Sequence, residues 1–503
     1  MAPGGSARLK RERGRARRYT LGMITIDALD ARYLSGEWRR AERSYALRSP
    51  ATGEELARVA DLGADAGREA AAVAWEAFLA WRRTTAFERA AVLERWQALM
   101  HEHAEELATT MAREMGKPLR ESRGEVAYAA GFVGWYAEEA KRVYGDAFPS
   151  QAGHKRLLAL KQPVGPAFAI TPWNFPLAMV TRKAAPALAA GCTMVLKPAE
   201  QSPLSALLLA DLWLDAGGPA GTLQVLPTAD PVPLADALIA DPRVRKLSFT
   251  GSTEVGRQLY AKSAATVKRI SLELGGHAPF LVFEDADVEE AVAQVMASKF
   301  RNAGQTCVCA NRVYVHESLV DAFTEAYAAA TERLVVGDPL DERTDIGPLV
   351  DEQAVAKVSR HVTDALERGA QLVTGGERRG GLYYAPTVLK GVAPDALMMR
   401  EETFGPVAPI VAFRDDAEAV RLANDTPFGL AAYLYTHDLT RALLVAEELE
   451  YGIVGVNDGV PSAPYAPFGG VKQSGVGREG GPWGIEEYLE TKFVSVGLRR
   501  EAL

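Results

Sequence analysis

The chain contains 503 residues, of which 48% are hydrophobic and 24% are charged, and its formal net charge at pH 7 is −8. This length predicts two or three domains of a globular protein. The negative charge disfavours nucleic acid as a partner, and the longest apolar run, LSALLLADLWL, is interrupted by Asp211, so no membrane span is expected. Three cysteines cannot build a disulfide framework, which favours a reducing, cytoplasmic location.

The first 22 residues differ from the rest of the chain. They contain seven Lys or Arg residues and one acid, with almost no apolar side chains. We expect this basic head to be disordered. It has neither the apolar face of an organelle-import leader nor the apolar core of a secretion signal. We therefore interpret it as a dispensable tail, or as the result of a start codon assigned upstream of Met23.

Helical spacing dominates residues 65–142, and Gly116 and Pro118 are expected to end a helix there. Short β-rich runs then alternate with helical runs from Lys161 onward, and a second alternating series runs from about Phe280 to residue 475. This alternation predicts an α/β fold with two doubly wound lobes and parallel sheets. Ligands of such sheets lie beyond the carboxyl ends of the strands, so the loops at those ends are the first candidates for a site.

Two of these loops could bind a nucleotide. In VLKPAEQSP, Lys197 can donate to ribose hydroxyls, and Glu200 can accept from a ribose diol while repelling a 2′-phosphate. FTGSTEVGRQ lacks the lysine and hydroxyl of a P-loop, but Gly251 allows close backbone approach and Ser252 begins a helix whose N-terminus attracts anions. Taken alone, each loop is better explained as an ordinary helix start.

Two further loops carry groups that could do chemistry. ITPWNFP holds Asn174 between Pro172 and Pro176, which stiffen the turn and fix an amide donor of the kind that stabilises an oxyanion. LELGGHAP ends a strand with Glu273, which becomes a general base if burial raises its pKa. The structural alternatives are an Asx-turn at Asn174 and a salt bridge at Glu273.

The stretch FRNAGQTCVCANR contains Cys307 and Cys309. Zinc needs four ligands and this pair supplies at most two. The other candidate, HEHAEE, has Glu105 where the second zinc histidine would stand, so no metal is expected. A disulfide within the pair would be strained, and Cys192 lies in an apolar run typical of a core thiol. Cys307 remains as a candidate nucleophile with Cys309 as its neighbour.

Cys307, Glu273 and Asn174 together supply a nucleophile, a base and an oxyanion donor, and with them the sequence resembles the aldehyde dehydrogenases. The motifs that carry the resemblance span about residues 25–495 and read, in order, TPWNFP, VLKPAE, FTGSTEVG, LELGGHAP, GQTCVCA, EETFGPV and PFGGVKQSGVGREG. The resemblance implies an NAD-binding lobe, a catalytic lobe and a small β arm for oligomerisation. The expected bounds are 23–145 and 164–275 for the first lobe, 276–475 for the second, and 146–163 with 476–503 for the arm.

The resemblance also implies roles for individual residues. Cys307 would attack the aldehyde, Asn174 would hold the oxyanion, and Glu273 would activate water to hydrolyse the resulting thioester. The cofactor would be NAD, preferred because of Glu200, or NADP. The residues expected to bind it are Thr171, Trp173, Lys197, Glu200, Gly251, Ser252, Glu402 and Phe404. A further turn that carries glycine in many relatives reads LPTADPVPLADAL here and has none.

Two arginines and a serine resemble the succinate-semialdehyde dehydrogenase branch. Arg182 follows Asn174 by eight residues and Arg301 precedes Cys307 by six. An arginine fork binds a carboxylate through two parallel hydrogen bonds, and in that branch the two arginines and a serine, here Ser462, hold the substrate carboxylate. This implies oxidation of succinate semialdehyde to succinate. Glutarate semialdehyde stays an alternative because a pocket separates substrates that differ by one methylene by only about 1–3 kcal/mol, as does a broad-specificity enzyme.

Three other expectations complete the prediction. In some members of the branch the second cysteine of C-V-C forms a reversible disulfide with the first, which makes Cys309 a possible redox switch. The β arm predicts a homodimer or homotetramer. Two alternatives of other classes are disfavoured: a cysteine hydrolase, because no histidine motif accompanies Cys307, and a non-catalytic protein of the same fold, because Cys307, Glu273 and Asn174 are all present.

Overall fold

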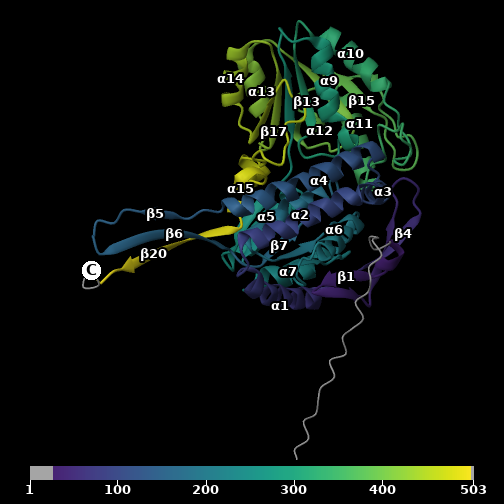
Figure 1. The fold of residues 1–503 in the computed structure, drawn as a ribbon. Helices are drawn as coiled ribbons and strands as arrows, with labels where there is room; N and C mark the ends of the chain where they lie inside the picture. The colour runs from purple at the N-terminus through teal and green to yellow at the C-terminus, as the bar shows by residue number, and fades with distance from the viewer. Residues whose placement is uncertain (1–25, 500–503) are drawn as a thin grey trace, which may run out of the picture.

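The structure is a computed structural model that describes residues 26–499. The predicted basic head, Met23 and residues 500–503 of the predicted arm lie outside the described residues. Figure 1 shows two α/β lobes, one above the other, and a narrow β arm that projects from the lower lobe. The two doubly wound lobes predicted from the alternating sequence are confirmed. No helix within the described residues is long and apolar enough to cross a bilayer.

The lower lobe is built on an eight-stranded sheet in the order β19-β11-β10-β7-β8-β9-β1-β2. Its five central strands are parallel, and the outer strands β1, β2 and β19 pair antiparallel. The strands are β1 (Arg32–Ser35), β2 (Glu37–Arg40), β7 (Ala167–Ile170), β8 (Met194–Lys197), β9 (Leu223–Val225), β10 (Lys246–Thr250), β11 (Arg269–Glu273) and β19 (Gly475–Val476). The strand order reverses between β7 and β10, which is the point where such sheets bind ligands.

Helices cover both faces of this sheet because its central strands are apolar on both sides. Along β7, the side chain of Phe168 packs with α1, α7 and α8, while Ala167 and Ala169 point to the opposite face and pack with α2 to α6. The helices are α1 (Ala64–Trp81), α2 (Ala86–Glu102), α3 (Ala104–Met115), α4 (Leu119–Glu139), α5 (Ala178–Ala190), α6 (Pro203–Asp215), α7 (Pro231–Ala240) and α8 (Thr253–Ala264). As predicted, α3 ends at Gly116, which has φ +81°.

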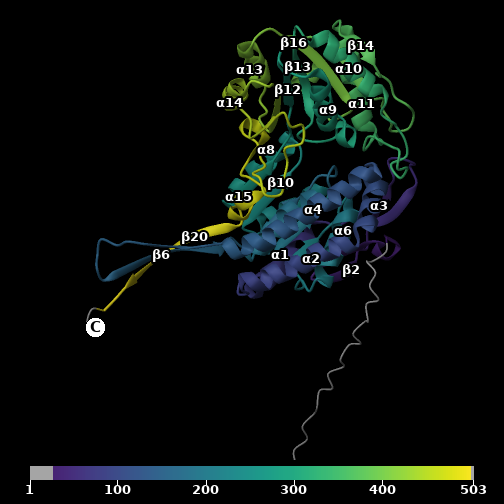
Figure 2. The same cartoon turned by 45° about the horizontal axis from the view of Figure 1, so that its top comes forward.

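The upper lobe is built on a seven-stranded sheet in the order β14-β15-β16-β13-β12-β17-β18, parallel except for β14. The strands are β12 (Ala278–Val282), β13 (Ala310–His316), β14 (Gln371–Thr374), β15 (Thr387–Lys390), β16 (Val407–Phe413), β17 (Ala431–Tyr435) and β18 (Ile453–Val456). The helices are α9 (Val288–Lys299), α10 (Val320–Glu332), α11 (Glu352–Glu367), α12 (Leu397–Arg400), α13 (Asp416–Asn424) and α14 (Leu439–Glu448). Figure 2 shows β10 and α8 at the junction of the two lobes.

The arm is a three-stranded antiparallel sheet in the order β20-β6-β5, formed by β5 (Asp146–Phe148), β6 (Lys155–Pro163) and β20 (Leu489–Gly497). The sequence predicted that the arm includes everything from residue 476. In the structure, β19 pairs with β11, and α15 (Gly481–Glu486) packs against α4 and α5 of the lower lobe. A separate hairpin joins β3 (Ser44–Arg48) to β4 (Glu55–Ala60).

Candidate active site

Two cavities meet at Cys307, between the lobes. The first, which we call the α4 cavity, measures about 300 Å³ and lies between α4, α5 and the loops before β13 and after β18. The second, the switch-point cavity, measures about 600 Å³ and opens at the carboxyl ends of β7 and β10. Cys307 and Met179 line both cavities. A group bound in either cavity can therefore reach the thiol.

Cys307 lies three residues before β13, at the amino edge of the upper sheet. In the lower lobe, the site loops leave the carboxyl ends of β7 and β10, as expected for a parallel sheet. Cys307 departs from this rule, because it lies at the amino end of its strand. The reason is the short connection between the lobes: β11 ends at Glu273 and β12 begins at Ala278. This connection brings the carboxyl edge of one sheet next to the amino edge of the other.

The glycine pair in this connection allows Cys307 to approach. A Cβ atom on Gly276 would lie 2.3 Å from the carbonyl oxygen of Cys307, closer than any real contact. The backbone N–H of Gly276 donates to Glu402 Oε1 at 3.2 Å. Only glycine fits between these two groups.

Asn174 is held at both its backbone and its side chain. Its Nδ2 donates to the carbonyl of Gln305 at 3.0 Å, two residues before Cys307. Its own carbonyl accepts from Lys117 Nζ at 2.7 Å and from Asn302 Nδ2 at 3.2 Å. One Nδ2 hydrogen is left for a ligand, and the amide is fixed in advance, as oxyanion stabilisation requires.

Burial sets the protonation of the two reactive groups. It raises the pKa of the Cys307 thiol to about 12, although nearby Arg182 acts in the opposite direction. It also raises the pKa of Glu273 well above the usual carboxyl range, and the neighbouring charge of Glu479 adds to this effect. A carboxyl group with a raised pKa is a stronger base once ionised.

Glu273 does not line either cavity. Both of its carboxylate oxygens are buried and lack a hydrogen-bond partner among the described residues. A Cβ atom on Gly469 would lie 2.9 Å from Glu273 Oε1, so the carboxylate rests against this glycine. The charge of Glu273 nevertheless acts on Cys307, where it contributes to the raised pKa of the thiol.

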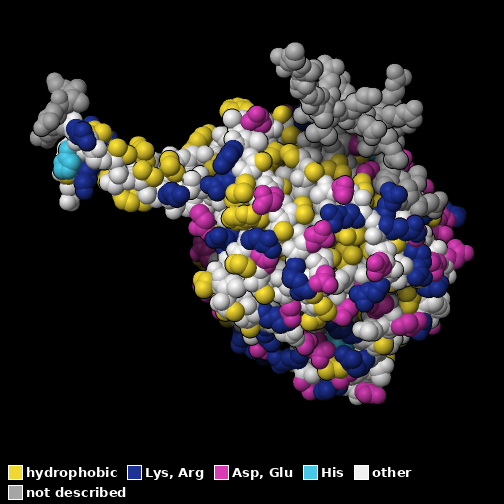
Figure 3. Space-filling view, turned by 90° about the horizontal axis from the view of Figure 1, so that it is seen from below, with side chains coloured by type: hydrophobic (Ala, Val, Ile, Leu, Met, Phe, Trp, Pro, Cys, Tyr) yellow, Lys and Arg dark blue, Asp and Glu magenta, His cyan; other side chains and the backbone are white. Residues whose placement is uncertain are grey.

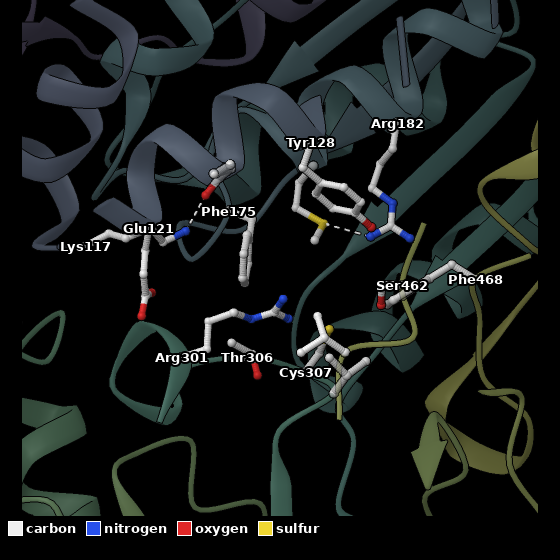
Figure 4. A pocket seen from close by; sticks show the side chains of 15 residues that line it. Lys117, Glu121, Tyr128, Phe175, Arg182, Arg301, Thr306, Cys307, Ser462 and Phe468 are labelled. Carbon is white, nitrogen blue, oxygen red and sulfur yellow. Dashed lines mark hydrogen bonds and ion pairs between the residues drawn. The ribbon is translucent and has the colours of Figure 1, made fainter. Parts of the chain in front are cut away.

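The α4 cavity contains the two predicted arginines and Ser462 (Figure 4). Arg182 forms an ion pair with Glu479, with Nε and Oε2 2.7 Å apart, and its Cζ lies 3.9 Å from the Phe468 ring centre. Arg301 forms no ion pair within the described residues, and its buried Nε has no partner there. A protein carboxylate therefore pairs with Arg182 but not, within the described residues, with Arg301.

One wall of the α4 cavity was not identified from the sequence. Lys117, Glu121, Glu125 and Tyr128 line it from α4 and the residues just before it, at spacings of four, four and three. These spacings place the side chains on one helix face. The sequence signal is the charged stripe itself, but the same pattern is typical of a solvent-exposed helix, so periodicity alone does not identify a site.

The switch-point cavity fits a dinucleotide. Gly251 and Ser252 line it, and Ser252 caps α8 by accepting from the N–H of Val255 at 3.3 Å. The N-terminus of α8 thus offers backbone donors to a phosphate, and Thr250 Oγ1 in the same wall is buried with no hydrogen-bond partner in the described part of the chain.

Aromatic and charged groups line the far side of this cavity. Trp173 and Phe404 meet edge to face with ring centres 5.6 Å apart. Glu402 lies beside them, and burial raises its pKa to about 7. Lys357 and Arg360 of α11 also line the cavity and were not predicted from the sequence. These cations suit an anionic ligand.

Three predicted cofactor residues lie outside the lining of this cavity. The N–H of Thr171 donates to the carbonyl of Lys197 at 3.1 Å, where β7 and β8 end side by side. Lys197 Nζ pairs with Glu200 Oε2 at 3.0 Å. Thr171, Lys197 and Glu200 therefore form a polar cluster where β7 and β8 end, one strand away from the switch point between β7 and β10.

The other two cysteines are fully buried. Cys309 lines neither cavity, and its Sγ lies 3.3 Å from Lys299 Nζ. Cys192 contacts the carbonyl of Tyr488. A Cys307–Cys309 disulfide is therefore not formed in this conformation, and Cys309 would have to leave Lys299 to make one.

Comparison with known proteins identifies the family of this arrangement. A family model described as the aldehyde dehydrogenase family matches residues 38–494. The succinate-semialdehyde dehydrogenase [NADP(+)] of Escherichia coli is 54% identical over 469 residues, covering 92% of this chain and 97% of that protein. A glutarate-semialdehyde dehydrogenase of Pseudomonas putida is 52% identical over 468 residues, covering 93% and 97%. The crystal structure of succinate-semialdehyde dehydrogenase from Burkholderia pseudomallei superposes with a TM-score of 0.92 at 52% identity, covering 93% of this chain and 98% of that one.

Proposed function

The chain belongs to the aldehyde dehydrogenase family, and we propose that it oxidises succinate semialdehyde to succinate with a nicotinamide cofactor. The observation that carries the substrate assignment is the α4 cavity, where Arg182, Arg301 and Ser462 share one space with Cys307. Arg301 in particular is half-buried, and its guanidinium, which has no ion pair within the described residues, can bind a substrate carboxylate. Relatives named for semialdehydes, at 54% and 52% identity, support the same assignment.

Covalent catalysis would proceed through Cys307. Once the thiol proton has passed to water, the Cys307 thiolate attacks the aldehyde carbon, while Asn174 Nδ2 and the backbone N–H of Cys307 hold the developing oxyanion. A bound nicotinamide would accept the hydride from this adduct. The thioester that remains on Cys307 is hydrolysed by water, from which the Glu273 carboxylate removes a proton.

The cofactor would occupy the switch-point cavity. Gly251, Ser252 and the start of α8 suit the pyrophosphate, and Glu402 with Phe404 suits the nicotinamide ribose. Lys197 and Glu200 suit the adenosine ribose. Thr171 supports Lys197 through its backbone hydrogen bond, and Trp173 lines the cavity beside Phe404. We expect NAD to be preferred over NADP, because the carboxylate of Glu200 repels a 2′-phosphate.

Initial rates with two aldehydes test the proposal. Wild-type protein should reduce NAD faster with succinic semialdehyde than with butanal, an uncharged aldehyde of equal carbon number, and Cys307→Ala should be inactive with both. Arg301→Ala should raise the KM for succinic semialdehyde by about tenfold or more and leave the KM for butanal unchanged. Equal rates with the two aldehydes would refute carboxylate recognition, and a faster rate with glutaric semialdehyde would reassign the substrate.

A further inference from the structure

Glu121 contacts the turn that presents Arg301. We propose that Glu121 is the positioning residue that makes the site selective for acidic aldehydes, because it holds Arg301 in place without neutralising it. This inference deepens the proposed function and rests on it.

The contact joins the two lobes. Glu121 is in the first turn of α4, and its Oε2 accepts a hydrogen bond from the backbone N–H of Asn302 at 2.7 Å. Asn302 follows Arg301 directly, so this bond fixes the peptide that carries the arginine. A hydrogen bond between a carboxylate and a backbone N–H is shorter and stronger than one between neutral groups.

The turn needs such an anchor because its backbone is strained. Asn302 and Ala303 have φ angles of +51° and +55°, in the left-handed region that non-glycine residues rarely adopt. Strain of this kind persists only where the surroundings impose it. The Glu121 carboxylate is one such constraint, and the Asn302 side chain, which donates to the carbonyls of Asn174 and Gln305, is another.

The charges of the α4 cavity are arranged so that Arg301 stays free. Lys117 pairs with Glu125, and Arg182 pairs with Glu479. Glu121 also faces this cavity, yet its carboxylate is bound to a backbone N–H and not to a guanidinium. Arg301 is left as the cation that a ligand carboxylate can neutralise.

The side chain of Arg301 has a second support in Phe175. Its Cζ lies 5.3 Å from the centre of the Phe175 ring, and Lys117 Nζ lies 3.7 Å from the same centre. In Figure 4, Phe175 stands between these two cations, and Arg301 extends from the Glu121 side of the cavity toward Cys307. Glu121 thus acts on the base of a side chain whose tip faces the substrate space.

Glu121→Ala and Glu121→Gln separate this role from a general structural one. In Glu121→Ala, the KM for succinic semialdehyde should rise about tenfold, and the KM for butanal should rise by a clearly smaller factor. In Glu121→Gln, which keeps an acceptor oxygen, the KM for succinic semialdehyde should rise about threefold. This variant also tests the proposal if Glu121→Ala does not fold. Glu138→Gln, an exposed position on the same helix, is the matched control and should behave as wild type.

A double variant tests whether Glu121 acts through Arg301. If it does, Glu121→Ala combined with Arg301→Ala should be no worse toward succinic semialdehyde than Arg301→Ala alone. Additive losses, or equal losses for both aldehydes, would overturn the inference. A wild-type enzyme without preference for the acidic aldehyde would overturn the proposed function itself, whereas a preference that survives Glu121→Ala would overturn only the role of Glu121.

Discussion

The Cys307 thiol is held in its protonated form by its surroundings, since burial raises its pKa to about 12. Alkylation requires the thiolate. We therefore expect the rate of alkylation by iodoacetamide to rise about tenfold per pH unit between about pH 7 and 9 without reaching a plateau. Mass spectrometry should find the label on Cys307, because Cys192 and Cys309 are fully buried.

Cys307→Ala is the control for this experiment and should remain unlabelled. A plateau below about pH 8 would contradict the raised pKa, because the thiolate fraction would then already be complete.

Cys309 is predicted to protect Cys307 from irreversible oxidation. Peroxide converts the Cys307 thiol to a sulfenic acid, and the Cys309 thiol can displace water from it to form a disulfide that added thiols reduce. After peroxide treatment, wild-type activity should return with dithiothreitol, whereas Cys309→Ala should recover less because further oxidation is irreversible. Cys192→Ala is the matched control. Equal loss and equal recovery in all three proteins would exclude the switch.

The residues proposed to do the chemistry stand out in the sequence, but the residue proposed to position one of them does not. Cys307, Glu273 and Asn174 occur in short motifs whose residue types are chemically restricted. Glu121 occurs in KPLRESRGEVAY, a charged helical stretch that looks like any solvent-exposed helix face. Its role follows only from the fold, which brings α4 against the turn before Cys307.

At the scale of elements, the connection between β11 and β12 depends on Gly276. Gly276→Ala would place a methyl group 2.3 Å from the Cys307 carbonyl, so the nucleophile must shift. A displacement of about 1 Å in a reacting group lowers kcat by about 10²-fold. We expect this loss in a stopped-flow assay, with little change in the far-UV circular dichroism spectrum.

Gly63→Ala is the matched control for this substitution, since a Cβ atom there would meet only the end of the Arg43 side chain at 3.8 Å. Wild-type kcat in Gly276→Ala would show that the connection tolerates the shift.

The capping of α6 by α3 predicts a pH-dependent stability. Glu114 accepts from the N–H groups of Leu204 and Ser205 at 2.8 and 3.0 Å, and burial raises its pKa to about 7. The folded protein then binds a proton that the unfolded chain, with a carboxyl pKa of about 4.3, has already released. Between about pH 4.5 and 7, the contribution of Glu114 to the free energy of unfolding therefore falls as the pH rises.

Glu114→Gln removes the titrating group but keeps an acceptor oxygen. The urea midpoint of Glu114→Gln minus that of wild type should therefore be more positive at about pH 7.5 than at about pH 5. Glu102→Gln, an exposed neighbour on α2, should show no such trend. A constant difference between the two pH values would mean that Glu114 is ionised throughout.

Element types were predictable because hydrophobic periodicity and turn residues are local. Which elements lie next to one another was less predictable. The stretch GVGREGGPWG is rich in turn residues, and nothing local shows that Gly475 and Val476 extend the lower sheet beside β11 or that α15 packs on α5. Likewise, the rule that ligands bind at carboxyl ends located Asn174 but not Cys307, whose position depends on how the two sheets are joined.

At the scale of the whole molecule, the active site exists only where the lobes meet. The lower lobe supplies Asn174 and Glu121, the upper lobe supplies Cys307 and Glu402, and hydrogen bonds join them at Gln305 and Asn302. Relative movement of the lobes would therefore separate the oxyanion donor from the nucleophile. The arm, by contrast, contributes no residue to the lining of either cavity. Its exposed apolar side chains are therefore not explained by the active site.

The arm exposes apolar side chains that predict assembly with further copies of the chain (Figure 3). Phe493 is 60% exposed and Phe148 is 43% exposed, and their rings stack with centres 6.1 Å apart. Exposed apolar surface on an unpaired sheet edge favours pairing with a second chain. Wild-type protein should therefore be a dimer or tetramer by light scattering, and Phe493→Asp should give a smaller species. Lys492→Asp, the adjacent exposed position of β20, should keep the wild-type mass, and a monomeric wild type would refute assembly through the arm.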